Sequence, residues 1–276
     1  MQAFPGSFLL LFYQIALGGL FAIAATPFHE LERGFFKSTA GVLFIFSLLG
    51  LLGKVQLYYK SLPGGIDLGM GAEMIFYILF VLFFALYLFS LWGEHTLFRA
   101  RTFSFSLLVG LTGLALSSHS FYQAPFWSFE TLLYPVSFFL SALLLGGVTV
   151  GMLIGHWYLI DTGQSIDPFV RIFRFFVISL IVQTIFLSTL PLWLYLLGTA
   201  NTVLSLQRLW EDHLFLLSSR LLVAQVGPLI LSYMIWRTLK IPHTMAATGL
   251  FYIALLGVFV GEILGRQILA LTSLPF

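Results

Sequence analysis

Cysteine is missing from this chain of 276 residues. Without a thiol the chain forms no disulfide, ligates no iron–sulfur cluster through cysteine and attaches no c-type haem. Any such group must therefore sit on a partner. Lys and Arg are also missing before Arg33, so the N-terminal stretch has no positive region of a secretory signal. We expect it to be retained as a membrane-spanning helix.

Charge is scarce throughout the chain. Only 9% of the residues are charged, whereas soluble domains carry about 25%, and 59% are hydrophobic. The net charge is only +2 and there is no basic tail, so nucleic acid is not expected as a partner. This composition predicts an integral membrane protein that crosses the lipid several times, with membrane lipid as its surroundings.

Long apolar runs recur along the chain. A spanning helix needs about 20 mostly apolar residues, and windows of that size find about eight candidates. We find no linker and no convincing internal repeat, so residues 1–276 are expected to form a single all-α membrane domain. The predicted spans are 7–28, 38–53, 74–92, 103–122, 129–157, 174–199, 214–236 and 244–270.

The distribution of Lys and Arg predicts the orientation, because cytoplasmic connections carry an excess of both. If the N-terminus is outside, three of these residues fall in outer connections: Lys54, Lys60 and Arg208. Eight fall in cytoplasmic connections: Arg33, Lys37, Arg99, Arg101, Arg171, Arg174, Arg237 and Lys240. An even number of spans then predicts that both termini lie on the outer, periplasmic side.

Polar residues concentrate in the outer half of the predicted bundle. They are Gln14, Lys54, Glu73, His119, Glu130, His213, Arg220, Glu262 and Arg266. Ionisable residues are costly in lipid and usually pair with one another or line a polar cavity. This concentration marks the outer half as the candidate functional region.

Each of these residues also has a plain structural interpretation. Glu262 and Arg266 stand one helical turn apart and form either a structural ion pair or a proton relay. Glu73 has no obvious partner four residues on, and it is either a proton acceptor or a charge favoured by the start of a helix. Gln14 could serve only to join helices. The Gly18–Gly19 pair is expected to permit close helix packing, together with Gly146, Gly147 and Gly151 of the fifth span.

The histidines do not form a recognisable metal or haem motif. His29, His95, His156 and His243 all fall at or beyond the cytoplasmic ends of predicted spans. Bis-imidazole ligation of a b-type haem needs two histidines at one depth within the bundle. We therefore expect no metal site and no haem on this chain, although a b-haem subunit remains an alternative. On the outer side, His119 is a candidate for proton handling.

Four segments resemble the membrane anchors of dimethyl sulfoxide reductase-type and related polysulfide reductase-like enzymes. "GEILGR" at residues 261–266 is similar to a Gly-Glu-x-x-Gly-Arg pattern in the last helix of that family, and "QIALGG" at residues 14–19 to a pattern in its first helix. Residues 120–147, "SFYQAPFWSFETLLYPVSFFLSALLLGG", resemble its connection into helix five. "LSSRLLVAQVGPLIL", which contains Arg220, resembles its helix seven.

The resemblance implies a haem-free, eight-helix subunit that binds quinol in the outer half of a bacterial or archaeal cytoplasmic membrane. It implies that electrons pass to an iron–sulfur partner, which feeds a catalytic subunit carrying molybdopterin; a hydrogenase is a further possibility. The family's quinol-site acid corresponds to Glu73. The family also has a His at the outer end of helix two, where this chain has none and Lys54 lies nearest.

A chemical role for these residues follows from what quinol oxidation requires. Removal of two protons and two electrons needs a group that accepts protons and a donor that holds the quinone oxygens. We expect Glu73 to accept protons, Lys54 or His119 to donate, and Gln14 or Arg220 to form a second polar wall. Menaquinone and ubiquinone both fit this scheme. A structural anchor without a working site and a secondary transporter are the remaining alternatives.

Overall fold

The computed structural model describes residues 3–61, 68–125, 127–160, 163–241 and 243–276, and these ranges contain helices and no strand. The first half of the chain forms α1 (Ala3–Ala24), α2 (Arg33–Ser61), α3 (Leu68–Ser90), α4 (Thr96–Ser118) and the short 3₁₀ helix η2 (His119–Phe121). The second half forms α5 (Phe129–Ile160), α6 (Asp167–Leu197), α7 (Ala200–Asp212), α8 (Leu214–Leu221), the π-helical turn η3 (Leu222–Val226), α9 (Gly227–Lys240) and α10 (Thr244–Thr272).

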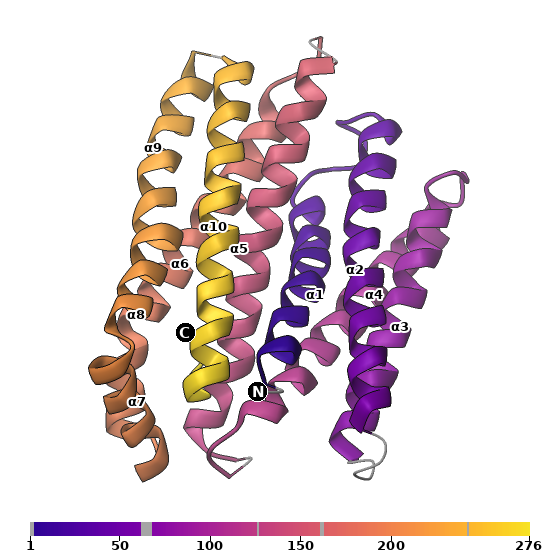
Figure 1. The fold of residues 1–276 in the computed structure, drawn as a ribbon. Coiled ribbons are helices and arrows are strands. Elements are labelled where there is room, and N and C mark those ends of the chain that lie inside the picture. Colours follow the sequence, from indigo (N-terminus) through magenta and orange to yellow (C-terminus); the bar gives the residue numbers. More distant parts are fainter. Residues whose placement is uncertain (1–2, 62–67, 126, 161–162, 242) are drawn as a thin grey trace.

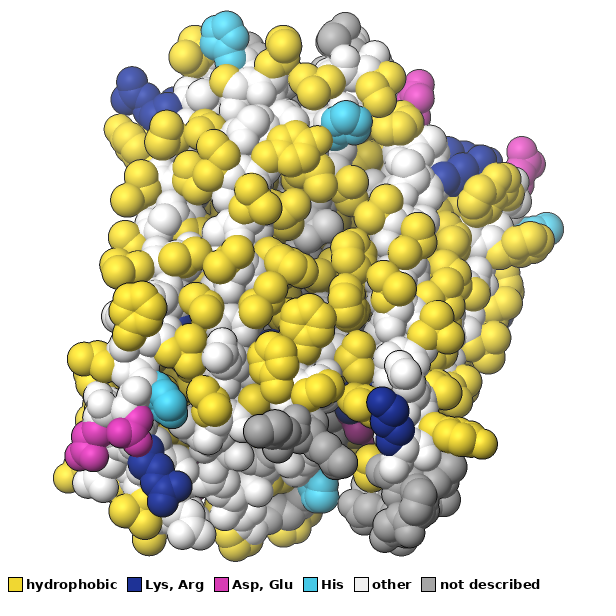
Figure 2. Space-filling view, viewed as in Figure 1, with side chains coloured by type: hydrophobic (Ala, Val, Ile, Leu, Met, Phe, Trp, Pro, Cys, Tyr) yellow, Lys and Arg dark blue, Asp and Glu magenta, His cyan; other side chains and the backbone are white. Residues whose placement is uncertain are grey.

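Eight of the described helical segments are long and apolar enough to cross a membrane, as the sequence predicts. In Figure 1 they stand side by side, and both ends of the chain lie in the lower half of the bundle. Figure 2 shows hydrophobic side chains over the middle of the visible face, with most of the charged side chains and histidines toward its two ends. This arrangement is that of a multi-pass membrane protein.

The second span is much longer than predicted. The sequence predicts residues 38–53, whereas α2 runs from Arg33 to Ser61. The apolar window ends at Lys54, but the following residues of "KVQLYYKS" continue the helix beyond the hydrophobic stretch. Hydropathy measures which residues suit lipid, and it does not detect where a helix ends. Lys54 therefore lies within a helix and not in a connection.

One helix is absent from the sequence prediction. α7 is an amphipathic helix of 13 residues between α6 and α8, with Thr202, Leu206 and Leu209 buried. Its N-cap is Thr199, whose hydroxyl accepts from the Thr202 backbone N–H. Because its polar residues dilute the apolar window, a search for spans passes over it.

Close contact between α1 and α5 joins the two halves of the chain. A Cβ added to Gly18 would lie 1.7 Å from the carbonyl oxygen of Ala142, and one added to Gly146 would lie 1.9 Å from the Gly18 carbonyl carbon. A side chain larger than hydrogen would force these backbones apart. The expectation that these glycines permit close helix packing is confirmed.

The last four residues, 273–276, fold back against α10 and α5 (Figure 1). Ser273 adopts a left-handed backbone conformation with a φ of 57°, which ends α10 and turns the chain. The Tyr134 hydroxyl then donates to the Ser273 carbonyl at 2.8 Å, and the Ser137 hydroxyl donates to the Pro275 carbonyl at 2.7 Å. These contacts place Ser273 beside the pocket described next.

Candidate functional site

A pocket of about 520 Å³ opens at the end of the bundle that carries the termini. Its walls come from the start of α1, the end of α2, the start of α3, η2 and Ser273. Most of the lining is apolar or aromatic; half-buried Lys54 and buried Glu73 stand within it, and exposed Lys60 also lines it. We call it the Lys54–Glu73 pocket.

Lys54 and Glu73 form an ion pair in this pocket. Lys54 Nζ donates to Glu73 Oε1 at 2.6 Å, and the whole Glu73 residue is only 6% exposed. The expectation that Glu73 lacks a partner is therefore wrong. The partner comes from the preceding helix, because the unpredicted extension of α2 carries Lys54 alongside the second turn of α3. The pair bridges two helices.

Aromatic rings form the inner wall of the pocket. Tyr77 lies one turn after Glu73 on α3, and Lys54 Nζ stands 5.6 Å from the centre of its ring. The Tyr13 ring packs against Tyr77 with centroids 4.2 Å apart. The Ser117 hydroxyl donates to the Tyr77 hydroxyl at 3.3 Å, and the Tyr13 hydroxyl donates to the Gly110 carbonyl at 2.9 Å. These contacts hold the wall in place from α1 and α4.

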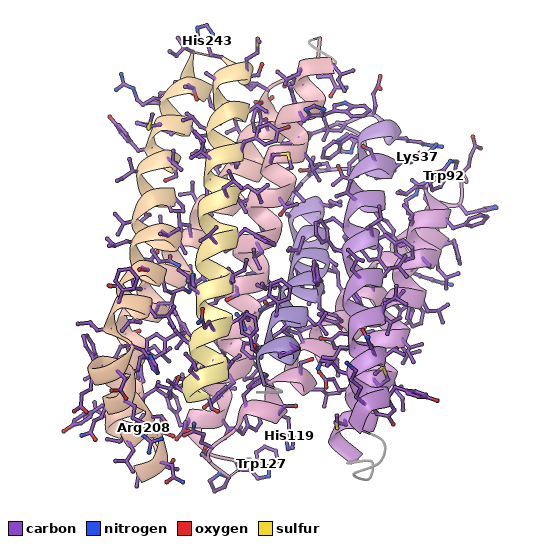
Figure 3. The ribbon with its side chains drawn as sticks, viewed as in Figure 1. Lys37, Trp92, His119, Trp127, Arg208 and His243 are labelled. Carbon is purple, nitrogen blue, oxygen red and sulfur yellow. The ribbon has the colours of Figure 1, made fainter. Side chains whose placement is uncertain are left out.

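Three other residues predicted for the site do not line this pocket. The Gln14 amide donates to the Phe138 carbonyl at 2.8 Å and so joins α1 to α5. This contact agrees with the structural interpretation of Gln14, in which it serves to join helices. His119 is exposed at the start of η2, next to the lining residues Ser120 and Phe121 (Figure 3). Arg220 belongs to a separate cluster.

That separate cluster contains three buried charges. Arg220 Nη2 donates to Glu262 Oε1 at 2.7 Å, and Arg266 Nη2 lies 3.4 Å from Glu262 Oε2. The predicted contact between Glu262 and Arg266 is confirmed, but the shorter contact comes from α8 and had not been predicted. We call Arg220, Glu262 and Arg266 the buried arginine cluster.

Glu130 has a structural partner as well. Its carboxylate accepts from the Thr199 backbone N–H at 2.8 Å and from the Thr202 hydroxyl at 2.5 Å. These bonds fasten the start of α7 to the start of α5. Glu130 thus anchors the amphipathic helix and does not reach the pocket lining.

The histidines lie away from the interior of the bundle. His29, His95, His156 and His243 are exposed, and Figure 3 shows His243 at the end opposite to His119. His156 Nδ1 lies 3.3 Å from the Tyr252 hydroxyl. Among the residues that the structure describes, no group of three or more His, Cys, Asp or Glu side chains is placed to hold a metal ion.

Several pocket residues were not singled out from the sequence. Tyr58, Met70, Met74, Tyr77 and Phe121 all line the Lys54–Glu73 pocket. Spacing would have found two of them, since Tyr58 follows Lys54 and Tyr77 follows Glu73 by one helical turn. No local pattern could have indicated Phe121, which is brought in from η2. Residues 62–67, which connect α2 to α3, lie outside the described part of the chain.

Comparison with protein-family models, with curated proteins and with solved structures finds no match to this chain.

Proposed function

We propose that this chain is a quinone-reactive membrane subunit of a respiratory oxidoreductase complex, with the Lys54–Glu73 pocket as its quinone site. The observation that carries the proposal is an ion pair in a pocket that is otherwise mainly apolar and aromatic. A carboxylate and an ammonium at such a position can serve proton exchange and hydrogen bonding to a bound head group.

The pocket residues fit a quinone head group. Binding pockets for small molecules measure about 300–1,000 Å³ and combine apolar walls with a few polar groups. The Lys54–Glu73 pocket has about 520 Å³, and Tyr77 and Phe121 provide flat apolar surfaces. A bound quinone or quinol would supply two-electron, two-proton chemistry that no side chain of this protein provides.

Each charged residue has a distinct chemical role in this proposal. The Glu73 carboxylate accepts one proton from a quinol hydroxyl and passes it to water at the pocket opening, and it then accepts and passes on the second proton in the same way. The Lys54 ammonium donates a hydrogen bond to the head-group oxygen. The ion pair uses Glu73 Oε1, so Lys54 exchanges one acceptor for another as the ligand enters. Tyr77 positions the ammonium through its ring.

The two electrons released with these protons leave to a partner. The chain has no cysteine to hold an iron–sulfur cluster, so the proposed acceptor is an iron–sulfur subunit that serves a molybdopterin enzyme or a hydrogenase. The Lys and Arg distribution supports a topology with both termini on the periplasmic side of a bacterial or archaeal cytoplasmic membrane. The proposed quinone is menaquinone or ubiquinone.

Binding of a quinol analogue tests the pocket directly. We expect a fluorescent alkyl-hydroxyquinoline N-oxide to be quenched with one-to-one saturation by the detergent-purified protein. Glu73→Gln and Lys54→Met should each weaken its binding by roughly tenfold, as expected for loss of one hydrogen bond to a charged group.

Lys37→Met is the matched control. Lys37 also lies on α2 and also stands over an aromatic ring, 5.0 Å from the centre of Trp92, but at the opposite end of the bundle (Figure 3). The affinity of the Lys37→Met variant for the quinol analogue should equal that of the unchanged protein. Equal affinities in all the variants would refute the site assignment, and the absence of saturable binding would favour a purely structural anchor. A b-type haem spectrum assigned to this chain would favour the haem alternative.

A further inference from the structure

The buried arginine cluster carries more positive than negative charge. Arg220 and Glu262 are 0% exposed and Arg266 is 1% exposed, so water reaches none of them appreciably. Two guanidinium groups face one carboxylate. The other ion pairs among the described residues lie elsewhere, since Glu73 pairs with Lys54 and Glu30 with Arg171. One positive charge in the cluster therefore has no protein counterion within ion-pair distance in the described part of the chain.

The cluster also has more hydrogen-bond donors than acceptors. A guanidinium has five N–H donors and no acceptor. Arg220 uses Nη2 on Glu262, whereas its Nε and Nη1 are buried without an acceptor in the described structure. Arg266 uses Nη2 on Glu262 and on the Ser141 hydroxyl at 3.3 Å, and its Nε has no acceptor either.

Neighbouring amides add to the surplus of donors. Gln183 Nε2 donates to Glu262 Oε1 at 2.8 Å and to the Ser141 hydroxyl at 3.1 Å. Its Oε1 is buried and unpartnered in the described structure, the only unsatisfied acceptor among these residues. Gln225, in the π-helical turn η3, accepts from the Thr184 hydroxyl at 2.6 Å and leaves a buried Nε2 without a partner there.

We propose that the buried arginine cluster binds one small monovalent anion, such as chloride, on the guanidinium N–H groups that no protein acceptor uses. An anion is an acceptor without donors, which is what surplus N–H groups require, and a single negative charge balances the two arginines and one glutamate. Isolated buried charge is strongly unfavourable, so the counterion stabilises the folded state. The proposal is independent of the quinone site, because none of these residues lines the Lys54–Glu73 pocket.

The surroundings of Arg220 set the size of the anion. A Cβ added to Gly265 would lie 2.7 Å from the Phe276 carbonyl oxygen and 2.8 Å from Arg220 Nε, so the guanidinium lies against the α10 backbone, near the Phe276 carbonyl. A groove of about 690 Å³ runs beside it between α6, α7 and α8, and Leu217 and Leu221 line this groove. Close packing at the cluster favours a compact anion over a large oxyanion.

Thermal unfolding of the purified protein tests the proposal. Replacing gluconate by chloride at constant ionic strength and pH should raise the unfolding temperature in a saturable manner, by roughly 3 to 5 °C. Bromide should act in the same way, because it has the same charge and a similar size. Arg220→Gln and Arg266→Gln should abolish the chloride effect.

Arg208→Gln is the control, because Arg208 is exposed on α7 outside the cluster (Figure 3) and its variant should keep the full effect. If either cluster variant fails to fold, crystals of the unchanged protein grown in bromide should show an anomalous scattering peak between Arg220 and Arg266. Equal unfolding temperatures in gluconate and chloride would overturn the proposal. A saturable effect that survives in folded Arg220→Gln would overturn it as well.

Discussion

The Lys54–Glu73 pocket and the buried arginine cluster both place charged side chains inside an apolar helix bundle, but they differ in exposure and in charge balance. In the pocket, one ammonium meets one carboxylate, and the two side chains keep 17% and 8% of their exposure. In the cluster, two guanidinium groups meet one carboxylate, and the Arg220 and Glu262 side chains keep 1% and 0%. The Lys54–Glu73 ion pair is balanced one to one, whereas the buried arginine cluster has two cations for one anion.

The two arrangements contribute differently to the stability of the fold. Opening an ion pair that solvent or a ligand can reach costs little free energy, because solvent or the ligand replaces the lost partner. A sealed charge has no such replacement, so its partners are needed for folding itself. The first arrangement suits exchange of protons and ligands, and the second suits a permanent internal scaffold. Three changes in the protein would sharpen this comparison.

The largest effect is expected from Glu262→Gln. Removal of its charge leaves two buried guanidinium groups without a carboxylate, and breaking a buried pair costs about 3–5 kcal/mol. We expect a matching loss in the free energy of unfolding, measured by denaturation in detergent, and a reduced yield of folded protein in membranes. Glu73→Gln is the comparison and should lose much less. Equal losses in the two variants would contradict the distinction between sealed and reachable charge.

Gly18→Ala should have the next largest effect, because it disturbs the contact that joins the two regions. The added methyl would lie 1.7 Å from the Ala142 carbonyl oxygen, and overpacking of this kind costs about 1–3 kcal/mol. Gly41→Ala on α2 is the control, since nothing lies within 4 Å of its added Cβ. The same unfolding measurement should find the control unchanged or stabilised by about 0.5–1 kcal/mol. A tolerated Gly18→Ala would mean that α1 and α5 pack less closely.

The smallest effect is expected from opening the Lys54–Glu73 pair. A double-mutant cycle with Lys54→Met and Glu73→Gln should give a coupling energy of about 1–2 kcal/mol. Because the Lys54 side chain keeps 17% of its exposure, this coupling should weaken as salt is added. The unfolding cycle repeated at low and high ionic strength measures both quantities. A large, salt-independent coupling would place this pair in the same class as the buried arginine cluster.

Much of the fold was predictable because hydropathy is a local property. Eight apolar runs predict eight spanning helices, and the structure has them. Small residues such as Gly18 and Gly146 predict close contact, which also follows from residue size alone. The amphipathic helix α7 escaped this kind of analysis because its stability comes from packing of one face and from Glu130 at its start.

The sequence identified individual residues of the candidate site, but it did not predict which of them are in contact. The sequence identifies Lys54 and Glu73 as polar residues near the ends of neighbouring spans, yet their contact depends on α2 continuing to Ser61. It also groups Arg220 with the pocket residues, whereas the fold pairs Arg220 with Glu262. Which residues meet depends on the rotation and depth of each helix, and neither is encoded within one apolar window.

By itself, then, the sequence determined an all-helical membrane chain, its approximate spans and the presence of charges within them, since these follow from composition and spacing along one helix. Only the tertiary structure decided that the charges form two separate groups, that Glu73 has a partner on α2, and that Glu262 is shared by two arginines. The physical reason is that contacts between helices arise from side-chain packing in three dimensions. That packing depends on residues that are far apart in the chain.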